Sequence, residues 1–117
     1  MFSIVKVHES IVKGDVVTWS DVDQMFILAT TQHAPLGVAD EDARTLDNHD
    51  GFYAAVKYAG LTFAKASREI PISGGEMQIE NGGVYVDNNA NGHGIICPIP
   101  FDQTVKPAGE LVLIHIR

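Results

Sequence analysis

The sequence predicts a mainly β protein that folds as a single compact β-sandwich or barrel-like domain with at most one or two short helices. Its 117 residues leave room for one domain. Eleven glycines and five prolines divide the chain into short runs, most of them rich in the Val, Ile, Tyr and Phe that strands favour. The connections between these runs are short, so a meandering sandwich or barrel is favoured over a large parallel sheet with crossover helices.

Eight runs have this strand composition. In chain order they are residues 3–7, 15–19, 25–29, 52–58, 76–80, 84–86, 95–99 and 110–116. The last run is apolar on both faces, which is typical of an inner strand and predicts that His115 is a core histidine. Asn81-Gly82-Gly83 joins two runs as a short hairpin connection. This hairpin would pair four residues on the core side, namely Met77, Ile79, Val84 and Val86.

Two further patterns concern local structure. Residues 38–46, and the spacing of Phe63, Ala66 and Ile70 before Pro71, are compatible with short helices. Glycine and an acid precede three of the strands, as in Gly14-Asp15. Glycine permits a positive φ at such a position, and we expect the acid to stay in solvent while the next residue enters the sheet.

The beginning of the chain is expected to form an N-terminal arm or edge strand over residues 1–12, ahead of a β-rich domain over residues 13–117. Edge strands that lack a partner tend to pair with a neighbouring chain. Trp19 is a large apolar side chain that either packs in the core or is buried against another subunit. The residues predicted to contact a partner are therefore Phe2, Ile4, Val5, Val7 and Trp19.

Charge narrows the class of partner. Fifteen acids against eight Lys and Arg give a formal charge of −7, which argues against nucleic acid and anionic lipid. The densest acidic stretch, residues 40–50, is a solvated loop, a loose divalent-cation site or a contact patch for a basic partner. The first residues lack the apolar region of a signal peptide and no stretch has 18 apolar residues, so we expect no membrane span and folding in a cytosol.

The sequence offers no strong signal for catalysis, a cofactor or a metal, and we expect none of the three. A single cysteine, Cys97, excludes an internal disulfide and a cysteine-built zinc site, and its apolar flanks favour a buried structural role over a nucleophile. The run Asp87-x-Asn89-x-Asn91-Gly92 matches half of a calcium loop, but Pro98 stands where the bidentate Glu belongs, so a polar hairpin loop is favoured. Neither a Gly-x-Ser-x-Gly elbow nor a metal-binding histidine spacing occurs.

The order of short motifs along the chain carries a family resemblance. They are Gly14-Asp15-Val16-Val17, Pro35-Leu36-Gly37-Val38-Ala39, Val56-Lys57-Tyr58-Ala59-Gly60, Ile72-x-x-Gly75-Glu76-Met77 and Gly109-Glu110-Leu111-Val112-Leu113-Ile114. Over roughly residues 11–117 this order resembles the small β-rich head decoration, or capsid-stabilising, proteins of tailed bacteriophages, whose fold is described as a β-tulip. The acidic residues 40–50 and the first ten residues depart from that pattern.

The resemblance implies a decoration protein made in the host cytoplasm and located on the outer surface of the virion capsid. Such a protein binds the mature shell, stabilises contacts between subunits of the major capsid protein, forms homo-oligomers with a trimer favoured, and has no active site. One alternative is a small ligand- or glycan-binding module, such as a virion fibre or tail component, with Trp19, Tyr53, Tyr58 or Tyr85 as platforms. Another is a hydrolase assembled from scattered His and Asp residues.

Overall fold

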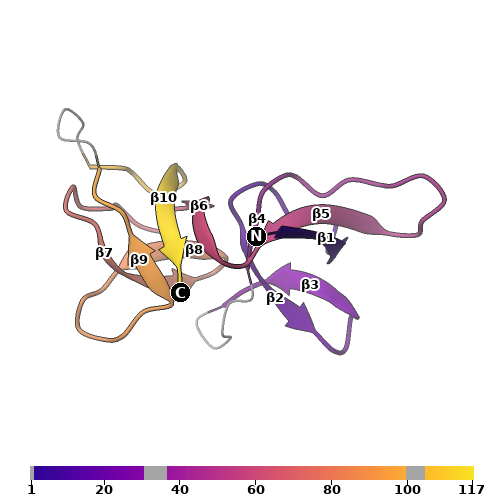
Figure 1. Cartoon of the computed structure of the whole chain (residues 1–117), viewed down its shortest axis with the longest axis horizontal. Helices are drawn as coiled ribbons and strands as arrows, with labels where there is room; N and C mark the ends of the chain where they lie inside the picture. Colours follow the sequence, from indigo (N-terminus) through magenta and orange to yellow (C-terminus); the bar gives the residue numbers. More distant parts are fainter. Residues whose placement is uncertain (1, 31–36, 100–104) are drawn as a thin grey trace.

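The computed structural model describes residues 2–30, 37–99 and 105–117, which form ten β-strands and no helix. The strands belong to two five-stranded sheets. Figure 1 shows the sheets as two lobes side by side along the longest axis of a molecule that measures 47 × 28 × 23 Å. The predicted mainly β, sandwich- or barrel-like fold is confirmed.

The first sheet closes into a small barrel, here called the barrel lobe. It contains β1 (Phe2–Val7), β2 (Val16–Ser20), β3 (Met25–Leu28), β4 (Gly37–Ala39) and β5 (Phe52–Lys57), in the order β1-β3-β2-β4-β5. The first strand pairs with β5 over its whole length, from Phe2 opposite Lys57 to Val7 opposite Phe52, and meets β3 at Val7 opposite Phe26. The barrel interior is built from aliphatic side chains that are mostly Val and Ala, namely Val7, Ile11, Val17, Ala39, Ala54 and Val56.

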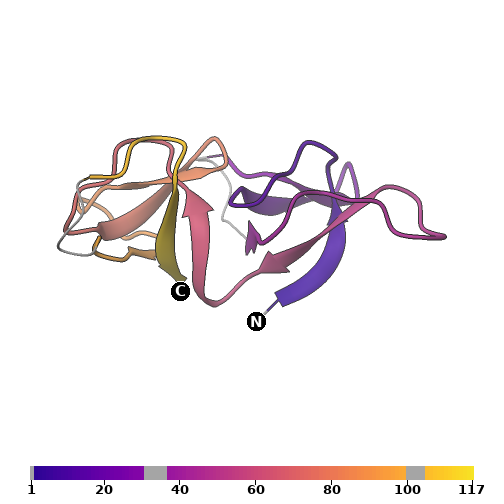
Figure 2. The same cartoon turned by 90° about the horizontal axis from the view of Figure 1, so that it is seen from above.

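The second sheet forms the sheet lobe. Its strands are β6 (Gly60–Lys65), β7 (Gly75–Glu80), β8 (Gly83–Val86), β9 (Gly94–Ile96) and β10 (Leu111–Ile116), in the order β6-β10-β9-β7-β8. Because β10 lies between β6 and β9, the predicted inner position of the last strand is confirmed. Figure 2 shows that the lobes are linked where β5 leads directly into β6 and that the N-terminus lies beside this link.

The predicted hairpin connects β7 to β8. Glu80 pairs with Gly83, so Asn81 and Gly82 form a two-residue turn. Their φ angles of 47° and 76° are both positive, which is the geometry of a type I′ turn and explains the Asn-Gly sequence. As expected, Met77 opposite Val86 and Ile79 opposite Val84 face the core.

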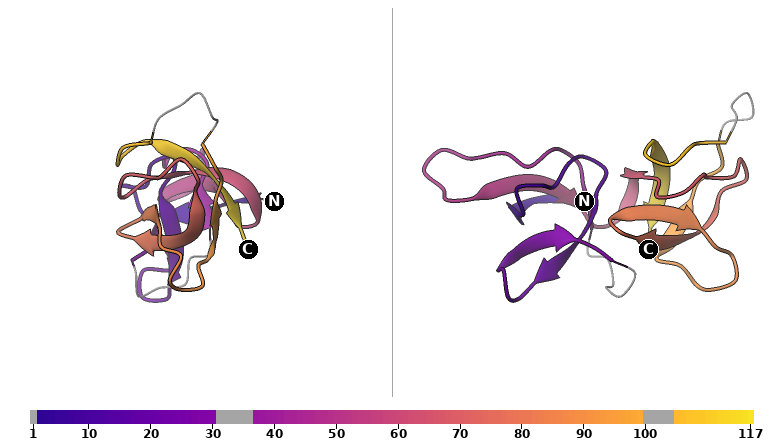
Figure 3. Two further views of the ribbon diagram at one scale, coloured as in Figure 1. Left: turned by 90° about the vertical axis from the view of Figure 1, so that its left-hand side faces the viewer. Right: turned by 180° about the vertical axis from the view of Figure 1, so that it is seen from behind.

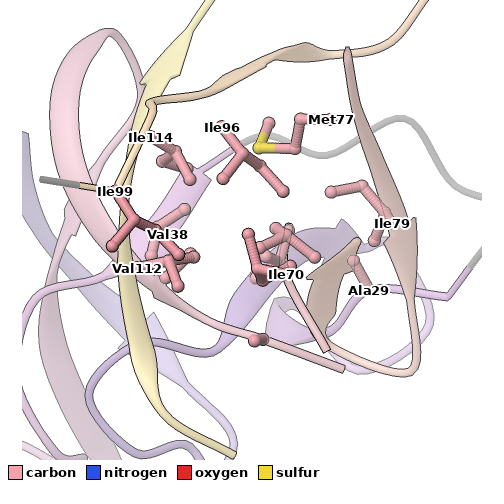
Figure 4. Packing of buried hydrophobic residues seen from close by; sticks show 13 residues of the cluster. Ala29, Val38, Ile70, Met77, Ile79, Ile96, Ile99, Val112 and Ile114 are labelled. Carbon is pink, nitrogen blue, oxygen red and sulfur yellow. The ribbon is translucent and has the colours of Figure 1, made fainter. Parts of the chain in front are cut away.

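The main hydrophobic core belongs to both lobes. Most of its side chains come from the sheet lobe, but Val16, Ala29 and Val38 enter it from the barrel lobe (Figure 4). A backbone hydrogen bond also joins the two lobes, because the Val16 N–H donates to the Gly82 carbonyl at 2.9 Å. The two lobes therefore form one packed unit.

Both helix predictions are wrong. Residues 38–46 instead contain the last two residues of β4, which ends at Ala39, and an isolated β-bridge between Arg44 and Tyr53. The second segment forms β6, in which Thr62 and Ala64 point inward while Leu61 and Phe63 point outward. Ala66 and Ile70 are buried at isolated bridges, whereas Phe63 is exposed on the outward side of β6, so the helical spacing of these three residues does not mark one buried face.

Two side chains lie where the sequence did not predict. His115 is exposed, because no described segment forms a second layer over the outward side of β10. Asp15 is buried at 6% exposure, where its carboxylate accepts hydrogen bonds from the Val12 N–H at 2.9 Å and from Lys65 Nζ of the sheet lobe at 3.1 Å. Asp15 is therefore part of the junction between the lobes and not a solvated acid before a strand.

Candidate interaction surface

An apolar surface covers the outward side of the sheet lobe. The register of β6, β10 and β9 places Leu61, His115 and Ile95 in one row, and Phe63 lies beside Leu113 in the next. Leu61 is 57% exposed and Phe63 is 51% exposed. We call this surface the apolar face and define it by five exposed side chains, Leu61, Phe63, Ile95, Leu111 and Leu113.

Strand alternation explains how the face arises. On β10, Val112 and Ile114 point into the core, so Leu111 and Leu113 must point to the other side of the sheet. A solvated antiparallel sheet ordinarily places polar residues there. The outward side of β6 and β10 therefore carries an exposed apolar patch within the described part of the chain, a feature that in other proteins marks an interaction surface.

A pocket of about 320 Å³ opens beside the apolar face. It is lined by Phe63, Cys97, Pro98, Ile99, Lys106, Leu111, Val112 and Leu113. Cys97 is half-buried, and its N–H donates to the Leu113 carbonyl at 2.9 Å, which holds the segment after β9 against β10. The pocket is thus continuous with the apolar face through the side chains of Phe63, Leu111 and Leu113.

The charged side chains around the sheet lobe form ion pairs. Arg117 donates two hydrogen bonds to the Glu76 carboxylate, at 2.9 and 3.0 Å, and this contact lowers the pKa of Glu76. Arg68 binds Glu80 in the same two-pronged way and lowers the pKa of that carboxyl. A longer pair joins Lys106 and Glu110 at 3.6 Å. Each of these three pairs is neutral as a unit, so its members add nothing to the net charge of the sheet lobe.

The acidic segment lies at the opposite end of the molecule. The loop between β4 and β5, which contains residues 40–50, reaches the far end of the barrel lobe in Figures 1 and 3. Glu41 accepts hydrogen bonds from Arg44 at 2.6 Å and from the Ala55 N–H at 2.8 Å, and both contacts lower its pKa. Asp40, Asp47 and Asp50 are exposed. Within the described parts of the chain, no group of three His, Cys, Asp or Glu is arranged to hold a metal ion.

The polar loop after β8 uses its side chains to hold its own backbone. Asn88 Oδ1 accepts the Glu76 N–H at 2.8 Å, and Asp87 Oδ1 accepts the Asn89 N–H at 2.9 Å. The second contact is the local side-chain to backbone contact that Asp makes in turns, whereas the first ties the loop to β7. Of the oxygens that resembled half of a calcium loop, Asp87 Oδ1 is thus engaged in turn formation.

The five residues predicted to contact a partner all lie on the barrel lobe, but they do not form one exposed surface. Phe2 and Ile4 are 60% and 53% exposed on the outer side of β1, whereas Val5 and Val7 pack against the barrel core. Trp19 is 40% exposed; its ring lies edge-on to Phe26, and its indole N–H donates to Asp21 at 2.8 Å. Contact of these residues with a partner stays a prediction, as does the division of the chain at residue 12.

The aromatic residues considered as ligand platforms are dispersed. Tyr85 lies under the Arg68 guanidinium at 3.9 Å, and the Tyr53 hydroxyl donates to the Asp50 carbonyl at 3.0 Å. Tyr58 and Trp19 are exposed on other elements. The 320 Å³ pocket is lined by none of the four. The structure therefore does not assemble them into one binding site.

Sequence reasoning missed the apolar face itself. Its signal is the alternation of Leu61 and Phe63 with the small Thr62 and Ala64, a period of two, whereas the prediction from sequence rests only on the helical spacing of Phe63, Ala66 and Ile70. The residues that the structure describes contain no helix that is long and apolar enough to cross a membrane.

Two five-stranded sheets that share a core define a small, two-lobed, all-β protein. A solved structure with a similar fold is the head fiber gp8.5 N base of bacteriophage phi29, at a TM-score of 0.69 and 16% sequence identity. The similarity covers 100% of this chain and 95% of that one. No family model and no curated protein sequence matches the chain. At this identity the likeness shows a shared fold.

Proposed function

We propose that this chain is a structural component of a phage head that binds the outside of the mature capsid and stabilises contacts between major capsid protein subunits, without catalysis. The observation that carries the proposal is the likeness of the whole chain to the base of a phage head fibre. The motif order in the sequence resembles head decoration proteins and points to the same location independently of that likeness.

The distribution of charge suits a protein that bridges two surroundings. Residues 1–58 contain nine acids and four Lys or Arg, a formal charge of −5, whereas residues 59–117 contain six acids and four bases, a formal charge of −2. The acidic end is the barrel lobe, and the apolar face is on the other lobe. A basic patch on the shell would attract the acidic loop, while the sheet lobe stays free for contacts of another kind.

Stabilisation of the shell needs no chemistry in this proposal. A protein that binds the mature shell, and not its unfolded or immature forms, raises the stability of the mature state by mass action. Many copies on one particle multiply modest individual contacts. The expected partner is therefore the folded surface of the major capsid protein, with three copies of this chain favoured for each assembly.

The direct test uses heads of the phage that encodes the chain, prepared without it. Purified protein is added, unbound protein is removed by sedimentation, and the particles are imaged by cryo-electron microscopy. We expect extra density at fixed lattice positions on the outer surface and a higher temperature of head disruption. Protein that stays in the supernatant, or density on the tail alone, would refute the proposal.

The role of the acidic loop is tested by charge removal. Asp40→Asn/Asp47→Asn removes two exposed charges from the loop, and Glu9→Gln/Glu69→Gln removes two exposed charges elsewhere. If the loop meets a basic capsid patch, only the first variant weakens head binding, and binding of the unchanged protein falls as salt rises. Equal binding by both variants at all salt concentrations would instead place the loop in solvent on the shell.

A second candidate is a fibre component that supports a longer appendage, which the phi29 likeness favours because that protein is a fibre base. The same images separate the two candidates. A decoration protein gives compact density of its own size, whereas a fibre base gives density that continues outward into a second, elongated component.

A further inference from the structure

We propose that the apolar face is the surface through which copies of this chain associate with one another. The occupant is a second copy of the same chain, which covers Leu61, Phe63, Ile95, Leu111 and Leu113 with the apolar face and pocket of its own sheet lobe. This inference concerns the oligomeric state that is part of the proposed function. Its test uses no capsids, so its outcome is independent of whether the protein binds phage heads.

The size of the face matches what a protein interface needs. From the exposed fractions of its five side chains, about 400 Å² of apolar surface is available, within the range of functional patches on monomers. A stable interface takes roughly 800 Å² from each partner, of which a little over half is apolar. The apolar face supplies about that apolar share, and the polar rim around it supplies the remainder.

Charge favours a second copy over a strongly charged partner. The cations around the face are already paired, Arg117 with Glu76, Arg68 with Glu80 and Lys106 with Glu110. A basic partner would find the carboxylates of these three pairs already neutralised. Most of the net negative charge belongs to residues 1–58 (−5, against −2 for residues 59–117), and the barrel lobe lies at the other end of a molecule 47 Å long, so two copies that meet through their sheet lobes keep most of this charge apart.

The shape of the surface is also suited to an identical partner. Leu61 and Phe63 project from β6, and the 320 Å³ pocket opens on the other side of Phe63, between β10 and the segment after β9. A projecting side chain of one copy can enter the pocket of the next. Repetition of that contact around an axis gives a closed ring, of which the favoured trimer is one case.

His115 marks the centre of the row that would be covered. It lies between Leu61 on β6 and Ile95 on β9, with Arg117 two residues along the same strand and Glu76 one strand beyond Ile95. A second copy would remove this imidazole from water together with its apolar neighbours. Replacement of His115 by an acid is therefore as disruptive as a charge on the apolar residues themselves.

The experiment measures association of the full chain in solution. Sedimentation equilibrium over a wide concentration range is applied to the unchanged protein, to Phe63→Glu, and to Val22→Glu as a control with the same charge change at a residue that is 93% exposed on the barrel lobe. We expect the unchanged protein and the control to associate alike. Phe63→Glu should raise the dissociation constant by about 30-fold or more, as loss of an interface hot spot does.

Cys97 gives a second readout inside the same molecule. It lines the pocket with Phe63 and Leu113, so association should slow its alkylation by N-ethylmaleimide as protein concentration rises. The rate should depend on concentration in the unchanged protein and in Val22→Glu, and not in Phe63→Glu. Leu61→Glu, at the other end of the face, serves as an independent variant, and circular dichroism verifies that each variant is folded.

Three results would overturn the proposal. The first is a monomer at all concentrations. The second is an oligomer that both Phe63→Glu and Leu61→Glu leave intact. The third is a monomeric protein whose binding to phage heads is abolished by these substitutions, which would assign the face to the capsid protein and leave the proposed head function standing. Conversely, self-association without head binding would support this inference and refute the proposed function.

Discussion

The two lobes differ in how they pair the edges of their strands and bury their apolar side chains. The barrel lobe closes its sheet on itself, so hydrogen bonds satisfy both edges of its strands and a small interior of mostly Val and Ala is sufficient. The sheet lobe stays open in its strand order and completes its core with Val16, Ala29 and Val38 from the barrel lobe. The core of the sheet lobe thus depends on side chains that the barrel lobe supplies.

The outer surfaces differ as much as the interiors. Most of the acids project from the barrel lobe, whereas the outward side of β6 and β10 is apolar and its rim is paired. The shared core indicates that the lobes fold together, although their outer surfaces differ in charge and polarity. The predictions below test that comparison, beginning with the strand on which barrel closure depends.

Deletion of residues 1–7 should have the largest effect. It removes β1, which pairs with β5 at six positions and closes the barrel. The deletion exposes unpaired strand edges and the small barrel core, so we expect a protein that does not fold, as measured by circular dichroism and Trp19 fluorescence.

The matched variant for that deletion is Phe2→Ser/Ile4→Ser, which changes only outward side chains of β1. It should stay folded, with a free energy of unfolding within about 1 kcal/mol of the unchanged protein. A folded, cooperative deletion protein would show that the first strand is an appended arm and that the barrel is not a necessary part of the fold.

Ile114→Ala should have the next largest effect. Ile114 is fully buried in the sheet lobe, and its truncation should cost about 2–5 kcal/mol of the free energy of unfolding through lost burial and the cavity that remains. The only tryptophan, Trp19, lies in the barrel lobe. Because the lobes share a core, urea unfolding followed by Trp19 fluorescence should shift as much as unfolding followed by circular dichroism.

Leu113→Ala is the control on the same strand, since Leu113 is 37% exposed on the opposite side of β10. In dilute, monomeric protein it should cost about 1 kcal/mol or less. If Ile114→Ala leaves the Trp19 transition where it was, the lobes unfold independently and the shared core does not couple them.

Much of the fold could be predicted from composition and turn chemistry. The Asn81-Gly82 turn specified its hairpin, and the alternation in residues 110–116 specified an inner strand. The strands β4 and β6 were not predicted, for different reasons. β4 has only three residues, and β6 carries small residues inward and large ones outward, the reverse of the usual pattern.

The candidate surface was harder to predict because exposure depends on what lies over a sheet. Leu111 and Leu113 have the same composition signal whether a second layer covers them or not, so the sequence suggested burial on both sides of β10. Likewise, Asp15 is charged and precedes a strand, and nothing local shows that Lys65, fifty positions later, folds onto it. Long-range pairing is information that residue patterns do not contain.

Asp15→Ala tests the polar part of the junction. Asp15 joins the Val12 N–H of its own lobe to Lys65 Nζ of the other, and it is almost fully buried. Its loss should cost about 1–3 kcal/mol, because a buried N–H loses its acceptor and a lysine loses its partner. Lys65→Met should cost less, since Asp15 keeps the Val12 contact; equal costs for the two substitutions would contradict this account.

The smallest expected effect is on the free energy of unfolding at acidic pH. The hydrogen bonds from Arg117 hold the pKa of Glu76 below its usual value of about 4.5, so the folded state binds this proton less readily than the unfolded state. The stability that results is present above that usual value and is lost as the pH falls through the lowered pKa. Glu76→Gln should therefore flatten the dependence of the free energy of unfolding on pH in this acidic range. Arg117→Gln should flatten it as well, and the double substitution should add nothing further. A double substitution whose slope is the sum of both changes would show that the two side chains act independently, and that the rim of the apolar face is not neutralised by this pair.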